Sequence, residues 1–553
     1  MLGSQLFLKL LSQEGVSLVF GNPGTTELPL MDAFAAEQNV RYVLTLQEAV
    51  AMAMADGYAR ASGKLGVVSL HVAPGLGNAI GMLYDAQKAG APLLVVAGQQ
   101  AQGFGLTEPN LYAELPPIAA PFVKWATEAH SAADLPRIIH RAAKVALSPP
   151  TGPVFVSLPT DVLLQEVSVD LGRPSRVAPL FRADPAAIRE AARLLAACER
   201  PVIIAGDAVS QSNAHAELVE LAELVGAPVY LEGESNSNSF PTTHALFAGH
   251  LVRSAKVIRN LLDKHDVLFS VGADLFTLSL PPVVEPVPSD LTVIHLDTDP
   301  WQLAKNYHTA PAMMGDPKTT LPEISQALRA SMTGTFSARA AERLTATRSA
   351  LAAARAELVA EARAAADRLP IDPLALMHAV GEVLPAEAIV VDETISSGRG
   401  LREFLKCDRA DSYHGIRGGG IGWGLPGAVG VKLAHPDRPV VALVGDGSAM
   451  YTPQALWTAA LCKAGIVFVI LANRNYNILQ QRLTAMQSFS VQANRFVGME
   501  LRPDIDYVGL GRSLGVEAHV AGTLQQFKEL LASGIRSQRP MLIEVEVARA
   551  AVG

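Results

Sequence analysis

The chain has 553 residues, of which 49% are hydrophobic and 18% are charged. This length and composition predict a large globular protein of about three or four domains. A formal net charge of −8 argues against a nucleic-acid or anionic-membrane surface, so we expect neither partner. The three cysteines lack disulfide or metal-ligand spacing, and the N-terminus lacks a signal-peptide pattern. We therefore expect a cytoplasmic protein.

The first third of the chain alternates between helical and strand patterns. Helices are expected at 5–14, at 48–61 and from about 78, and strands at 17–20, 42–45, 65–70, 93–97 and 154–158. This alternation predicts a doubly wound α/β domain over residues 1–175. The loop at 21–27 follows the first strand, where folds of this class bind ligands, and its sequence is GNPGTTE.

The rest of the chain repeats this pattern twice. Residues 172–185 are rich in proline and polar residues and predict a linker. A middle α/β domain is expected over 186–336, followed by an Ala- and Arg-rich helical linker at 337–368. A third α/β domain is expected over 369–553. The predicted fold class is therefore α/β, with three doubly wound parallel-sheet domains.

The stretch 440–479 predicts a complete strand, turn, helix and strand. Strands are expected at 440–444 and 466–471, with a helix at 453–464 between them. The first strand ends at Gly445-Asp446-Gly447 and the second at Asn473-Arg474-Asn475. Because the carboxyl ends of parallel strands share one edge of a sheet, Asp446 and Asn473 are expected side by side, with the oxygen ligands that Mg²⁺ prefers.

This stretch resembles the thiamin-diphosphate-binding motif, which opens with GDG and closes with asparagine. The order of the three regions resembles the decarboxylase and acetolactate synthase branch of the thiamin-dependent enzymes, with pyrimidine-binding, middle and diphosphate-binding domains. The resemblance implies two cofactors, thiamin diphosphate and Mg²⁺. It assigns Mg²⁺ to the side chains of Asp446 and Asn473 and the main-chain carbonyl of Asn475. It also places Gly445, Gly447 and Ser448 at the diphosphate.

Glu48 lies in LQEA, followed by ADGYA at 55–59, and these segments resemble those around the glutamate that bonds N1′ of the aminopyrimidine. The alternative is an ordinary acid at a helix start. The resemblance also places Pro23 and Asn78 at the cofactor. In this family the glutamate and the metal site come from different subunits. At least a homodimer is therefore implied, or a homotetramer if dimers pair.

Three further positions have a functional and a structural interpretation. The cluster Gly418 to Gly422 could be a flexible loop. By resemblance, the Gly419 carbonyl accepts from the 4′-amino group and the Ile421 side chain props the cofactor in its bent form. Ser396 follows a strand and could donate to the diphosphate or be a plain turn serine.

Within the branch, the segments at 21–29, 70–79 and 445–460 are most similar to benzoylformate decarboxylases. Thr25 would then bind the substrate carboxylate, His71 would transfer protons, and Leu479 would shape the substrate pocket. A histidine at a strand end could equally be structural. The second histidine of those enzymes is absent, because none occurs between His265 and His295, and Ser279 takes its place in an ungapped alignment.

The leading hypothesis is non-oxidative decarboxylation of a benzoylformate-like α-keto acid to an aldehyde and CO₂. The main alternative is a carboligase of the acetolactate-synthase type, which joins two carbonyl compounds. Two features favour it: the missing histidine and the form of residues 473–479. A third hypothesis is a catalytically silent protein that binds the cofactor. The partner in the two enzymatic hypotheses is a small α-keto acid or aldehyde.

Overall fold

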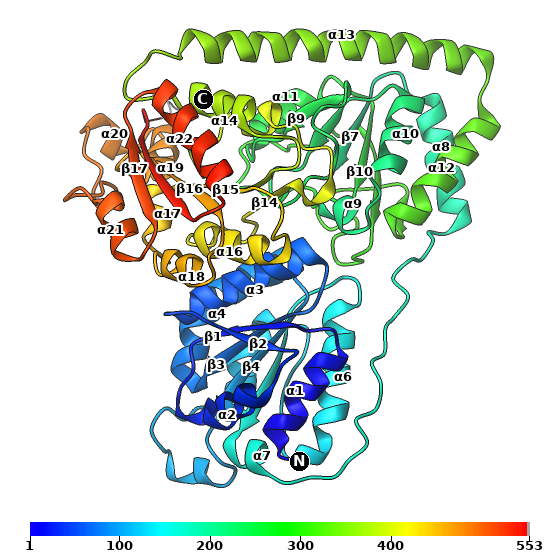
Figure 1. Cartoon of the computed structure of the whole chain (residues 1–553). Helices are drawn as coiled ribbons and strands as arrows, with labels where there is room; N and C mark the ends of the chain where they lie inside the picture. The colour runs from blue at the N-terminus through cyan, green and yellow to red at the C-terminus, as the bar shows by residue number, and fades with distance from the viewer. Residues whose placement is uncertain (550–553) are drawn as a thin grey trace. The chain divides into compact units, whose positions relative to one another are not determined.

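The computed structural model describes residues 1–549, and Figure 1 shows their helices and strands. Within this range the chain forms three six-stranded sheets. The sheets are parallel and helices connect their strands, so the predicted class of three doubly wound α/β sheets is confirmed.

The first sheet has the strand order β2-β1-β3-β4-β6-β5. Its strands are β1 (Leu18–Gly21), β2 (Arg41–Leu44), β3 (Gly66–His71), β4 (Leu93–Gln99), β5 (Ala126–Glu128) and β6 (Val154–Pro159). Its helices are α1 (Gly3–Gln13), α2 (Leu28–Ala36), α3 (Glu48–Ser62), α4 (Val72–Ala89), α5 (Leu115–Ala119), α6 (Leu135–Leu147) and α7 (Thr160–Leu164). The central strands β4 and β6 are buried along their whole length, as expected for apolar strands covered on both faces.

The second sheet has the order β12-β11-β10-β7-β8-β9. Its strands are β7 (Pro201–Ala205), β8 (Val229–Leu231), β9 (Phe247–His250), β10 (Val267–Val271), β11 (Thr292–Asp297) and β12 (Ala312–Met314). The helices of this part are α8 (Pro185–Ala197), α9 (Asp207–Gln211), α10 (His215–Val225), α11 (Ala255–Leu262) and α12 (Pro317–Ser331), and the chain continues through α13 (Gly334–Ala364), α14 (Pro373–Val383) and α15 (Leu401–Phe404).

The third sheet has the order β14-β13-β15-β16-β18-β17. Its strands are β13 (Ile389–Glu393), β14 (Tyr413–Gly415), β15 (Val440–Gly445), β16 (Ile466–Ala472), β17 (Glu517–Ala521) and β18 (Met541–Glu546). Its helices are α16 (Gly424–Ala434), α17 (Asp446–Ala449), α18 (Ala455–Leu461), α19 (Asn477–Ala485), α20 (Phe489–Gln492), α21 (Tyr507–Ser513) and α22 (Leu524–Ser537). Strands β15 and β16 pair in parallel, so Gly445 lies opposite Leu471 at the edge that carries Asp446 and Asn473.

The chain divides into two compact units. The first comprises Met1–Val177, Ala388–Ser397 and the residues from Ile416 onward, and the second comprises Ala178–Glu387 and Gly398–Gly415. The first unit therefore contains the first sheet together with β13 and β15 to β18. The division into three domains at the boundaries predicted above stays a prediction.

Within the first unit, helix α3 packs closely along α16 because glycines face the contact. A Cβ at Gly57 would lie 2.3 Å from the carbonyl oxygen of Gly427, and one at Gly430 would lie 2.0 Å from that of Met54. Figure 1 shows the two helices side by side, α3 in blue and α16 in yellow. This packing positions the helix that begins at Glu48 against the segment that follows the glycine cluster.

Two predicted helix boundaries were wrong. Helix α4 begins at Val72, not near 78, so the segment after His71 is helical and not a glycine-rich loop. Pro74 is tolerated there because the first turn of a helix leaves its N–H groups unpaired in any case. Helix α18 covers only Ala455–Leu461, because residues 450–454 form turns.

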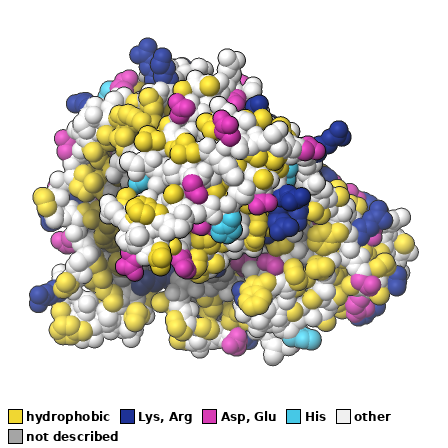
Figure 2. All heavy atoms as spheres, turned by 90° about the horizontal axis from the view of Figure 1, so that it is seen from below, with side chains coloured by type: hydrophobic (Ala, Val, Ile, Leu, Met, Phe, Trp, Pro, Cys, Tyr) yellow, Lys and Arg dark blue, Asp and Glu magenta, His cyan; other side chains and the backbone are white. Residues whose placement is uncertain are grey.

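Acidic and basic side chains are interspersed with apolar ones on the face drawn in Figure 2. Large apolar side chains are exposed at several points of the first unit, including Leu28 and Leu106. Over residues 1–549, no helix has both the length and the apolar character that crossing a membrane requires.

Candidate active site

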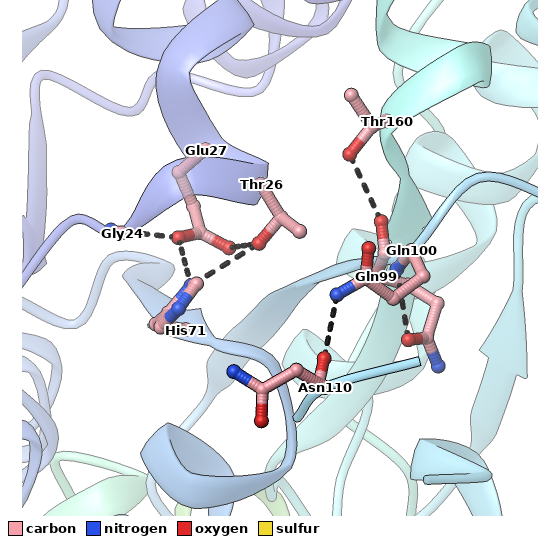
Figure 3. Close-up of polar contacts among 8 residues, drawn as sticks. All are labelled: Gly24, Thr26, Glu27, His71, Gln99, Gln100, Asn110 and Thr160. Carbon is pink, nitrogen blue, oxygen red and sulfur yellow. Dashed lines mark hydrogen bonds and ion pairs between the residues drawn. The ribbon is translucent and has the colours of Figure 1, made fainter. Parts of the chain in front are cut away.

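The side chains of His71, Glu27 and Thr26 form a hydrogen-bonded group at one edge of the first sheet (Figure 3). His71 is the last residue of β3, and its Nδ1 lies 2.8 Å from Oε2 of Glu27. Glu27 is fully buried, and its Oε1 accepts a 2.6 Å hydrogen bond from the Thr26 hydroxyl. The backbone N–H of Gly24 donates to the same Oε2 at 2.8 Å. Because a carboxylate only accepts hydrogen bonds, Nδ1 of His71 carries a proton and Nε2 is left for another partner.

The backbone around this group explains why the side chains meet. Strands β1, β3 and β4 are neighbours, so the residues at their carboxyl ends gather at one edge of the sheet. A Cβ at Gly98 in β4 would lie 1.8 Å from Oε1 of Glu27, and one at Gly24 would lie 2.2 Å from the His71 ring. Both glycines therefore make room for the Glu27–His71 pair. The same edge carries Gln99 and Gln100 in Figure 3.

Glu48 forms a second group on helix α3. The Gln47 side chain caps this helix by accepting from the N–H groups of Ala49 and Val50, which places Glu48 in the first turn. Oε2 of Glu48 accepts a 3.0 Å hydrogen bond from Nδ2 of Asn78 on α4. A Cβ at Gly75 would lie 3.3 Å from Oε1 of Glu48. The structure thus brings together the predicted cofactor residues Glu48 and Asn78.

The third group contains the predicted metal ligands. Oδ1 of Asp446 accepts from the N–H of Gly447 at 2.8 Å, and Oδ2 accepts from that of Arg474 at 2.6 Å. Oδ1 of Asn473 accepts from the N–H of Asn475 at 2.9 Å. Burial raises the pKa of Asp446, since it penalises the charged carboxylate.

These residues fit a magnesium ion by the chemistry of their oxygens. Carboxylate and amide oxygens are hard ligands. The main-chain carbonyl of Asn475 is the predicted ligand; its side-chain amide is buried too, and neither the oxygen nor the nitrogen of that amide has a hydrogen-bond partner among the described residues. Across residues 1–549, no three His, Cys, Asp or Glu side chains form a group able to hold a metal. A metal bound here would therefore depend on the asparagines as well as on Asp446.

The two glycines of the GDG motif differ in what requires them. A Cβ at Gly447 would lie 2.5 Å from the Tyr476 ring, so the protein itself excludes a side chain there. At Gly445 the nearest atom to an added Cβ is the Glu393 carbonyl oxygen, at 3.8 Å, and the φ angle is −65°. Neither space nor backbone requires a glycine at that position, which is typical of a site that a ligand approaches closely.

Strained backbone adjoins two of the three groups and also the predicted residue Ser396. Val72 has φ 39°, Ile395 has φ 45° and Arg474 has φ 56°, values that side chains other than glycine rarely adopt. They adjoin His71, Ser396 and the Asn473–Asn475 segment respectively. Such strain persists only where the surrounding structure enforces it, and it clusters at functional sites.

The remaining predicted residues lie as follows. Ile421 is partly buried, and Ser448 hydrogen-bonds the buried Glu393. Of the other predicted positions, Pro23, Thr25, Gly419 and Leu479 are exposed to solvent, and Ser396 is partly exposed.

Several residues of these groups were not predicted from the sequence. Glu27 and Thr26 lie in the loop 21–27 that was expected to bind a ligand, but the sequence did not assign either of them a role. Tyr42 was also missed. Its hydroxyl is buried without a hydrogen-bond partner among the described residues, and burial together with the charges of Glu27 and Glu48 raises its pKa.

The position of the missing second histidine is in the second unit. The hydroxyl of Ser279 is buried and has no hydrogen-bond partner in the described part of the chain. The next histidine along the chain, His295, is buried and its Nε2 lies 3.0 Å from the carbonyl oxygen of Ala273. Burial lowers the pKa of His295 to about 4, which disfavours its protonated form.

Comparison with known proteins agrees with this geometry. Residues 1–106, 188–324 and 396–545 match the N-terminal TPP-binding, central and C-terminal TPP-binding domains of thiamine pyrophosphate enzymes. Benzoylformate decarboxylase of Pseudomonas aeruginosa is 32% identical over 97% of both chains. The chain belongs to the thiamine pyrophosphate enzyme family.

Both kinds of enzyme considered above, acetolactate synthases and decarboxylases, occur among the proteins similar to this chain. A putative acetolactate synthase large subunit of Mycobacterium tuberculosis is 29% identical over 99% of both chains. The structure of a thiamine diphosphate-dependent 4-hydroxybenzoylformate decarboxylase of Rhodococcus jostii has a TM-score of 0.86 and 30% identity, with all of both chains covered. The predicted family is confirmed, and the chain is a thiamin-diphosphate-dependent decarboxylase or carboligase.

Proposed function

We propose that this chain decarboxylates an aromatic or bulky 2-oxo acid of the benzoylformate type to an aldehyde and CO₂, with thiamin diphosphate and Mg²⁺. The observation that carries the proposal is the hydrogen bond between buried Glu27 and Nδ1 of His71. It leaves Nε2 of His71, whose side chain is 20% exposed, to hold or release a proton at the substrate. A decarboxylase needs such a group, because protonation completes its reaction.

The residues fit the cofactor as two separate groups. When bound, thiamin diphosphate supplies a nucleophilic carbon and accepts the electron pair released with CO₂. Glu48 would hold the proton at N1′ of its aminopyrimidine, with Asn78 orienting the carboxyl group. Asp446, Asn473 and Asn475 would hold Mg²⁺. The residues that would contact the rest of the cofactor are Pro23, Ser396, Gly419, Ile421, Gly445, Gly447 and Ser448.

The substrate would lie beside the His71 group. Thr25, an exposed residue two positions before Glu27, would donate its hydroxyl to the substrate carboxylate. Leu479, 46% exposed on α19, would pack against an aromatic or bulky side chain. His71 would then give a proton from Nε2 as the imidazolium, while Glu27 holds the proton on Nδ1 and stabilises the positive charge.

We also propose a cytoplasmic homodimer at least, with a homotetramer formed when dimers pair. Large apolar side chains are exposed next to both cofactor groups: Leu46 is 44% exposed, Met450 38% and Tyr451 58%. A second copy of the chain would remove this apolar surface from water.

The second candidate function is a carboligase of the acetolactate-synthase type. It is favoured by the absence of any histidine from 266 to 294. In that reaction a second carbonyl compound reacts where a decarboxylase would add a proton, so the absence of a second proton donor would not slow it.

The test is a steady-state assay of the purified protein with thiamin diphosphate and MgCl₂. Benzoylformate, 4-hydroxybenzoylformate and pyruvate would be supplied singly, with CO₂, aldehyde and 2-hydroxyketone or acetolactate measured in parallel. We expect CO₂ and aldehyde in equal amounts from the aromatic acids. Condensation product without free aldehyde would establish the carboligase instead, and no CO₂ from any substrate would refute both.

A further inference from the structure

The segment at 416–423, between β14 and α16, has no regular structure but carries Gly419 and Ile421. Two of its glycines have left-handed backbone, with φ 83° at Gly419 and φ 107° at Gly422. A loop of this composition would be flexible if it had no external contacts. Two buried carboxylates of the first unit contact it from different elements.

The first carboxylate is Asp85 on helix α4, which is 2% exposed. Its Oδ1 accepts a 3.0 Å hydrogen bond from the N–H of Gly420. A Cβ at Gly418 would lie 2.0 Å from Oδ1, and one at Gly420 would lie 2.8 Å from Oδ2. Oδ2 has no hydrogen-bond partner among residues 1–549. Asp85 therefore occupies the space that side chains at these two positions would need.

The second carboxylate is Glu393 at the end of β13, which is 1% exposed. Its Oε1 accepts from the N–H of Gly422 at 2.6 Å, and its Oε2 accepts from that of Gly424 at 2.5 Å. The hydroxyl of Ser448, just after the GDG motif, also hydrogen-bonds Glu393. Glu393 thus joins the glycine segment to the candidate diphosphate site.

The two carboxylates thus accept hydrogen bonds from the N–H groups of three alternate residues, Gly420, Gly422 and Gly424. The residues between them are Ile421 and Trp423, and Nε1 of Trp423 donates to Asp56 at 2.5 Å. Ile421 therefore lies between two anchored backbone groups, and its direction is set by both carboxylates together. Neither carboxylate is among the residues assigned to the cofactor above.

We propose that Asp85 and Glu393 form a carboxylate clamp whose role is to position Gly419 and Ile421 for the cofactor. They are positioning residues, because they would act through the loop and not by contact with the cofactor. The inference rests on the proposed function, since it gives the loop the cofactor contacts assumed there. It adds two acids to the proposed site and explains the glycines at 418, 420 and 424 by the close approach of these acids.

The clamp makes opposite predictions for two amide substitutions. Each side-chain oxygen of Glu393 accepts a hydrogen bond from one backbone N–H group. Glu393→Gln would replace one of these oxygens by an NH₂ group, which cannot accept, so one of the two hydrogen bonds would be lost. Asp85 receives one N–H on one oxygen, so Asp85→Asn can keep that bond and place its NH₂ where Oδ2 has no partner. Asp85→Ala would lose the bond.

The first test needs no cofactor. Hydrogen–deuterium exchange of the full chain, followed by mass spectrometry of peptides that cover 416–424, reports the clamp directly. We expect exchange in this segment to accelerate roughly 10- to 100-fold in Glu393→Gln and Asp85→Ala, the cost of leaving a buried N–H group without its hydrogen-bond partner. Asp85→Asn should stay within about threefold of the wild type.

The second test measures positioning. Thiamin diphosphate binding would be followed by tryptophan fluorescence, and its C2 proton exchange by NMR at saturating thiamin diphosphate and Mg²⁺. Glu393→Gln and Asp85→Ala should slow C2 exchange about 10-fold or more, and Asp85→Asn should not. Asp207→Asn is the matched control, because Asp207 holds the N–H groups of Asn236 and Ser237 in the second unit in the same manner.

The outcomes separate this inference from the function on which it rests. Faster amide exchange with unchanged C2 exchange would make the clamp merely structural and overturn the proposal. Unchanged amide exchange in Glu393→Gln would overturn the clamp itself. A wild-type protein that binds no thiamin diphosphate would refute the proposed function, whatever the amide exchange shows, and the positioning role with it.

Discussion

The substitution Glu27→Gln tests the role of the Glu27–His71 pair. It keeps the size and shape of the side chain but removes its charge. In the structure Glu27 accepts three hydrogen bonds, from His71, Gly24 and Thr26. Glutamine can still accept from His71 and Gly24 through one oxygen while its NH₂ donates to the Thr26 hydroxyl. The fold should therefore survive, and the lost property is the stabilisation of a positively charged His71.

The size of the effect follows from that geometry. A hydrogen bond to a charged group contributes about 1.5–3 kcal/mol and a neutral one about 0.5–1.5 kcal/mol. The difference of roughly 1–1.5 kcal/mol predicts a loss of about 5- to 15-fold in kcat/KM for benzoylformate. His71→Gln should cost about 100-fold or more, since it removes the proton-transfer group itself.

The assay is kcat/KM at saturating cofactor for the two single variants and the double variant. Glu14→Gln is the matched control, because buried Glu14 pairs with Nδ1 of His140 in the same domain but away from the candidate site. It should change thermal stability without changing kcat/KM. If Glu27 acts through His71, the double variant should be no slower than His71→Gln alone. Independent, multiplicative losses, or a wild-type rate in Glu27→Gln, would refute the pairing.

Four further predictions follow from the site. Glu48→Gln should abolish C2 proton exchange of thiamin diphosphate, measured by NMR, while circular dichroism stays that of the wild type. Asp446→Asn should raise the Mg²⁺ concentration for half-maximal activity by at least about 10-fold, measured by titration of the metal-free protein; an unchanged value would rule out Asp446 as a ligand. Gly447→Ala should lower the melting temperature by several degrees because its Cβ meets Tyr476, whereas Gly445→Ala should keep that temperature and weaken cofactor binding. Burial raises the pKa of Glu393 from 4.5 to about 7, so its stabilisation is complete below pH 4.5 and is lost as pH rises through 7; denaturation across that range should show a smaller pH dependence in Glu393→Gln than in the wild type.

Much of the fold could be predicted from local pattern. Apolar segments such as VVALVG and IVFVILA identify strands buried on both faces, and their regular separation by helices predicts parallel sheets. The edge that joins Asp446 to Asn473 follows from this alternation alone, since parallel strands end together. The start of α4 could not be predicted, because its glycines and Pro74 are typical of loops as well as of a first helical turn.

The sequence by itself therefore determined the fold class, the family and the residues that a motif names, such as Glu48 and Asp446. Only the tertiary structure decided which other groups act with them. Glu27 meets His71 from 44 residues away, and Asp85 meets Gly420 from 335 residues away. Such pairs carry no local periodicity, because strand order and helix packing bring them together. Glu27 stands in the segment 21–27 and His71 ends a separate strand, so neither segment by itself shows that the two side chains meet.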